Sequence, residues 1–157
     1  MIAIACRSVV ACAALLVAPC ALAVVSCTVA SNGVAFGSYD PSALVSNKSA
    51  GNIDVSCSGT LLQVVPFAVA LSTGNGTYAT RRLTNGASGL DYNLYIDPAY
   101  LVRWGDGSFG SQVASASLTL AVSPTLKSLV VYGQIPAGQT TAIVGSYTDS
   151  VIVTVSF

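Results

Sequence analysis

Hydrophobic and polar residues alternate along the last part of the chain. One set of alternate positions holds Val151, Val153, Val155 and Phe157, and the positions between them hold Ile152, Thr154 and Ser156. A period of two in β-branched residues predicts a β-strand with one strongly apolar face. We expect that face to be covered either by earlier strands of the chain or by a segment from outside it.

Similar short runs recur upstream, separated by residues that favour turns. The predicted strands are 28–30, 34–36, 52–57, 61–71, 78–83, 90–96, 113–122, 129–136 and 151–157. Pro66 is expected at the start of its strand or at a bulge. The sequence Gly74-Asn75-Gly76 predicts a hairpin turn, and Ser42–Gly51 is expected to be a polar loop.

The spacing of these runs predicts the fold class. Turn signals recur about every 8 to 15 residues, and no helical period and no linker occurs between them. The sequence therefore predicts one all-β domain, a sandwich or a barrel. Composition agrees, because the chain is 53% hydrophobic and 8% charged and has no Glu to cover the solvent face of a helix.

Charge excludes several functions. The net charge is zero, so no basic surface is available for nucleic acid. The one concentration of positive charge is Arg81 and Arg82 with Arg103, which we expect to be solvated; an anionic ligand is the alternative. The sequence also contains no His, the usual general base beside a nucleophilic serine.

The acidic residues offer no obvious site either. Asp91 and Asp97 would lie roughly 20 Å apart on one strand, too far to cooperate in glycoside hydrolysis. Asp106 lacks the further carboxylates of a calcium loop and is expected in a turn. We therefore predict no enzyme activity, no catalytic residue, no metal site and no cofactor.

The N-terminus predicts export. Arg7 precedes an apolar run, Pro19 interrupts it, and Ala21-Leu22-Ala23 has the form of a signal-peptidase site. The prediction is a signal peptide at 1–23 and a domain at 24–157; a membrane anchor is the alternative. Cys27 and Cys57 then remain as a pair in an oxidising compartment, where a disulfide would contribute roughly 3 to 4 kcal/mol.

Seven short motifs follow one another along the chain. They are Phe36-Gly37-x-Tyr39-x-Pro41, Gly51-x-Ile53-x-Val55-x-Cys57, Arg82 after a hairpin, Leu90-x-Tyr92-x-Leu94-Tyr95, Trp104-Gly105-Asp106-Gly107, Tyr132-Gly133-x-Ile135 and Gly145-x-Tyr147-x-Asp149. In this order they resemble the spore coat protein U domain family, which includes secreted subunits of archaic chaperone–usher pili. The resemblance covers about Cys27–Phe157.

The resemblance implies an incomplete immunoglobulin-like β-sandwich that lacks its last strand. A periplasmic chaperone, and then an extension of the next pilin subunit, would supply that strand by edge addition at an outer-membrane usher. Val151, Val153, Val155 and Phe157 would then border the groove. The expected location is the periplasm, followed by the cell surface or a pilus.

The first cysteine lies close to the predicted cleavage site. Three residues, Val24 to Ser26, would precede Cys27 in the mature chain. Such a chain would accept a donor strand without supplying one, which favours a tip or terminal subunit with a role in adhesion or biofilm formation. A surface receptor would then be a further partner.

Two other classes of protein remain as alternatives. A small outer-membrane β-barrel also ends in a strand with apolar alternate positions and a terminal Phe. A secreted carbohydrate-binding module would use Trp104, Tyr95 and Tyr100 as a platform on which a sugar stacks. For these aromatic residues we favour a place in the sandwich core.

Overall fold

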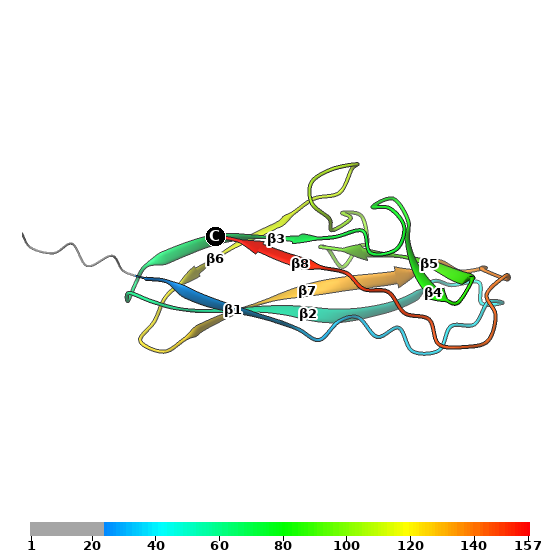
Figure 1. Ribbon diagram of the computed structural model, residues 1–157, viewed down its shortest axis with the longest axis horizontal. Coiled ribbons are helices and arrows are strands. Elements are labelled where there is room, and N and C mark those ends of the chain that lie inside the picture. The colour runs from blue at the N-terminus through cyan, green and yellow to red at the C-terminus, as the bar shows by residue number, and fades with distance from the viewer. Residues whose placement is uncertain (1–23) are drawn as a thin grey trace, which may run out of the picture.

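The structure is a computed structural model that describes residues 24–157, so the predicted signal peptide lies outside the described part. Eight strands form two sheets that face each other (Figure 1). The strands are β1 (Ser26–Ser31), β2 (Asn47–Ser58), β3 (Val64–Leu71), β4 (Arg81–Asn85), β5 (Ser88–Tyr95), β6 (Ala114–Thr119), β7 (Thr125–Ile135) and β8 (Val153–Ser156). One sheet has the order β1-β2-β7-β5-β4 and the other β6-β3-β8.

The core lies between the sheets and follows the alternation of the sequence. In β2 the buried apolar residues are Ile53, Val55 and Cys57, and every second residue between them is partly exposed. In β3, positions 65, 67, 69 and 71 are buried in the same way. The alternating pattern therefore places one face of each of these strands in the core.

The fold class predicted from the sequence, an immunoglobulin-like sandwich, is confirmed. A local feature of such folds precedes the last strand: the hydroxyl of Tyr147 donates to the carbonyl of Ile143 at 3.0 Å and accepts from its N–H at 2.9 Å. This is the arrangement of a tyrosine corner. None of the described residues forms a helix long and apolar enough to cross a membrane.

Several predicted boundaries are wrong. Residues 34–36 form no strand, and the predicted loop 42–51 becomes part of β2 from Asn47 onward. The turn at residues 74–76 does not join a hairpin, since β3 and β4 belong to different sheets. Pro66 lies inside β3, but outside the Ala68–Leu71 stretch that pairs with β8.

Arg81 is fully buried, which corrects the expectation that it is solvated. Its guanidinium donates to Asn93 Oδ1 at 2.7 Å, to the carbonyl of Trp104 at 2.7 Å and to the carbonyl of Ser72 at 2.9 Å. Burial lowers the pKa of this guanidinium from its usual value. The side chain therefore acts as a bracket that holds together three segments distant in sequence.

Replacement of Arg81 by Met is expected to destabilise the fold by about 3 kcal/mol or more, because buried acceptors lose their donor. Urea denaturation measures the effect. Arg82→Met is the matched control, since the Arg82 side chain is 52% exposed and its ion pair with Asp91, at 3.7 Å, contributes less than about 1 kcal/mol. Equal losses in the two variants would contradict the bracket role.

Candidate functional site

The strands β1 and β8 each lie at the outer edge of a sheet. Within the described residues, β1 pairs with β2 alone and β8 pairs with β3 alone. β1 begins and β8 ends at the same end of the molecule, so the two run in opposite directions (Figure 1). Each strand therefore has one edge without a strand partner among residues 24–157.

Three cavities lie along these edges, and together we call them the groove. The disulfide-end cavity, about 300 Å³, is lined by Cys27 of β1 and by Phe157 after β8. The middle cavity, about 340 Å³, is lined by Ser31 at the end of β1 and by Val151 and Val153. The loop-end cavity, about 400 Å³, lies between residues 36–41 and residues 142–147.

Core residues form the floor of the middle cavity. Ile53, Leu71, Leu94 and Val131 line it, although each is almost completely buried. An occupant of this cavity would therefore contact the side chains that also hold the two sheets together.

The predicted groove-edge residues occupy different positions. Val151 and Val153 line the middle cavity, and Phe157 lines the disulfide-end cavity while remaining 62% exposed. Val155 lies between the cavities and is partly buried against the core, opposite Val69. That these residues receive a partner strand stays a prediction.

Residues 33–39 form the other wall of the groove, and sequence reasoning mistook part of them for a strand. After β1 the chain crosses the inner face of its own sheet, where a side chain at Gly51 would overlap the carbonyl of Gly33. A Cβ at Gly133 of β7 would lie 2.7 Å from both Val34 and the ring of Phe36. Glycines inside predicted strands were the signal for this close approach.

Side chains of β2 hold this wall in place where sheet hydrogen bonds do not. Ser49 Oγ donates to the carbonyl of Ala35 at 2.6 Å, and Asn47 Nδ2 donates to the carbonyls of Phe36 and Ser38 at 3.1 and 3.0 Å. The wall therefore has a defined position although it belongs to no sheet.

A polar pair borders the middle cavity. The hydroxyl of Tyr92 donates to Asp149 Oδ2 at 2.7 Å, and the backbone N–H groups of Asn75 and Ser150 donate to Asp149 Oδ1. Burial, and then the hydrogen bond to Asp149, raise the pKa of Tyr92 above its usual value near 10. Both carboxylate oxygens of Asp149 are thus satisfied from within the chain.

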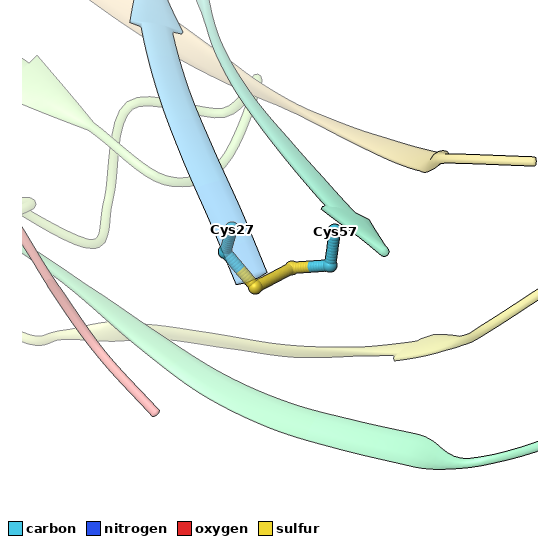
Figure 2. The surroundings of a disulfide bond; sticks show 2 residues. All are labelled: Cys27 and Cys57. Carbon is cyan, nitrogen blue, oxygen red and sulfur yellow. A yellow bond between two sulfur atoms is a disulfide. The ribbon is translucent and has the colours of Figure 1, made fainter. Parts of the chain in front are cut away.

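The predicted disulfide joins the groove edge to the main sheet. Figure 2 shows Cys27 of β1 linked to Cys57 of β2. The two residues are directly opposite in the register of the strands, with a Cα–Cα distance of 4.1 Å. The cross-link therefore fixes the first turn of the groove wall.

The aromatic platform predicted for a sugar does not form as a unit. Trp104 is fully buried, and its indole N–H donates to the carbonyl of Val69 at 2.8 Å, so it offers no free face. Tyr95 and Tyr100 do meet, edge to face at 5.5 Å, with Lys48 4.2 Å from the ring of Tyr100. Sugar binding by Tyr95 and Tyr100 stays a prediction.

The acidic residues singled out in the sequence have local roles. Asp97 accepts hydrogen bonds from the N–H groups of Leu101 and Val102, and Asp106 accepts from the N–H and hydroxyl of Ser108. These bonds lower the pKa of both carboxyls. Among the described residues, no three acidic or cysteine side chains lie close enough to hold a metal ion.

The comparison with known proteins identifies the family. The Spore Coat Protein U domain matches residues 11–154, which is most of the chain. The chain therefore belongs to the Spore Coat Protein U domain family, as its motifs predict. No curated protein is similar enough to match it.

A solved structure shares the fold. It is the CsuC-CsuE chaperone-tip adhesion subunit pre-assembly complex from the archaic chaperone-usher Csu pili of Acinetobacter baumannii. The likeness has a TM-score of 0.58 and 24% identity, and it covers 85% of this chain. The chain spans 40% of the length of that solved chain.

Removing the disulfide with Cys27→Ala and Cys57→Ala is expected to cost about 3 to 4 kcal/mol, because the unfolded chain regains the freedom of the closed loop. Denaturant titration of the oxidised protein and the double variant measures the loss. A difference below about 1 kcal/mol would mean that the β1–β2 ladder holds the groove wall without the cross-link.

Stability should fall above pH 10 in part because of Tyr92. A raised pKa in the folded state means that the contribution of the neutral phenol is complete below about 10, the value in the unfolded chain, and is lost as the pH rises. Tyr92→Phe should flatten this dependence and cost about 1 kcal/mol at neutral pH. Thermal unfolding from pH 7 to 11 tests it, and an unchanged slope would contradict the assignment.

Proposed function

We propose that the protein is a secreted structural subunit of a bacterial surface assembly of the chaperone–usher pilus type. The observation that carries the proposal is the groove, since it is apolar, reaches the core, and lies between two strand edges without partners among the described residues. An extended segment of another polypeptide would fill it. The role is structural and not catalytic.

Strand addition satisfies both needs of this site. The main chain of an inserted strand would pair with the free edges, and its alternate side chains would enter the cavities. Because β1 and β8 run in opposite directions, the inserted strand would be antiparallel to one and parallel to the other. Along residues 147–157 the groove accepts about eleven extended residues, roughly 36 Å.

The proposed partners follow from the family and from the likeness to a chaperone–subunit complex. They are a periplasmic chaperone, an outer-membrane usher and other pilin subunits. The chain would pass through the periplasm to the cell surface. A place at the tip of a fibre, with adhesion or biofilm formation as its role, stays a prediction because it depends on residues outside the described part.

An aspartate in the groove should abolish strand binding. The full chain is expressed in a periplasm with an archaic-type chaperone, and complex formation is measured by co-purification and native mass spectrometry. Val153→Asp is expected to reduce the complex at least tenfold, because a carboxylate would be buried against an apolar occupant. Thr154→Asp is the matched control, since Thr154 is exposed on the opposite face of β8.

The tests must separate binding from folding. Near-ultraviolet circular dichroism of each variant shows whether the core is intact. If the wild-type chain is monomeric and stable alone, and binds neither chaperone nor strand peptide, the proposed function is wrong. If both variants bind equally, the site of strand addition lies elsewhere.

A further inference from the structure

The disulfide-end cavity contains a buried polar atom without a partner. Gln63 Oε1 is buried and forms no hydrogen bond, the one such side-chain atom among residues 24–157. The other side chains of this cavity are apolar or sulfur-containing: Val25, Cys27, Val64, Val65, Pro66 and Phe157. A buried acceptor without a donor is unfavourable, so an unpaired one at a binding site points to a donor on the ligand.

The position of Gln63 is fixed by its main chain. Its N–H donates to the carbonyl of Thr60 at 3.2 Å, and its carbonyl accepts from the N–H of Leu120 at 2.9 Å. The preceding residue, Leu62, has a φ of 63°, a left-handed conformation that is costly for a leucine. The turn therefore holds the amide at the mouth of the cavity although this requires an unfavourable backbone.

We propose that the strand bound in the groove carries a hydroxyl or amide side chain over the disulfide-end cavity, and that this side chain donates a hydrogen bond to Gln63 Oε1. The proposal rests on the proposed function. The partner is thus an extended segment with apolar residues at alternate positions, except at the end that lies beside Cys27. There the pattern requires a polar residue.

This contact would set the register of the bound strand. An apolar strand can shift by two residues and still present its apolar face to the groove. With a polar residue at one end, such a shift moves the donor away from Gln63 and leaves both groups unpaired. The middle cavity, with Ile53, Leu71 and Val131 in its floor, would then receive the polar side chain.

Threonine and valine provide a matched test because they have nearly the same shape. The probes are synthetic eleven-residue peptides with apolar alternate positions that carry Thr or Val at the end beside Cys27. Both peptide directions are made, since a strand parallel to β8 places its C-terminal end there and an antiparallel one its N-terminal end. Binding to the protein purified from the periplasm is measured by fluorescence anisotropy.

The wild-type protein is expected to bind the Thr peptide about three- to tenfold more tightly than the Val peptide. Gln63→Met, which keeps the length of the side chain and removes the acceptor, should reverse the order. Gln63→Glu keeps the acceptor and should retain the preference for Thr, so a folding defect in the Met variant does not remove the test.

The outcomes separate this inference from the function on which it rests. If no peptide binds, the proposed function fails. If peptides bind but the wild-type protein shows no preference for Thr, or the preference persists in Gln63→Met, the role of Gln63 is overturned while strand addition stands.

Discussion

The pairing of β2 with β7 is the interaction on which the rest of the structure depends. Eleven residue pairs join these strands, from Asn47 opposite Ile135 to Cys57 opposite Thr125. β1 is attached to the outer side of β2, and β5 to the outer side of β7. The same ladder carries Gly51 and Gly133, whose missing side chains admit the wall of the groove.

The groove and the core are therefore one system. The residues that line the middle cavity are the ones that hold the sheets together, so an occupant would extend the core as well as bind to it. A ligand that binds the folded chain alone raises its stability by mass action. The stability of this subunit would then belong to the complex, and a melting temperature without its concentration and partner would have little meaning.

Much of the fold could be predicted from local pattern. Alternation identified β3, β5 and β8 because their buried faces are apolar at every second residue, and parity identified the pair Cys27 and Cys57 once export was assumed. Residues 34–36 were mistaken for a strand because their apolar side chains do enter the core, from a chain segment that belongs to no sheet.

The polar part of the site was harder to find. Arginine is mostly exposed in proteins, and only the tertiary arrangement of Ser72, Asn93 and Trp104 offers Arg81 its acceptors. Gln63 is a single amide without a motif, and its significance depends on the cavity around it. Sequence reasoning locates apolar faces well, but buried polar groups depend on long-range neighbours.

The position of the disulfide has a consequence for the order of events in the life of the chain. Cys27 belongs both to the cross-link and to the lining of the cavity at one end of the groove. A reduced chain would have a looser wall at this end, so oxidation should precede capture by a partner. The redox state of the compartment would then act as a checkpoint, admitting to assembly only chains that have been exported and oxidised.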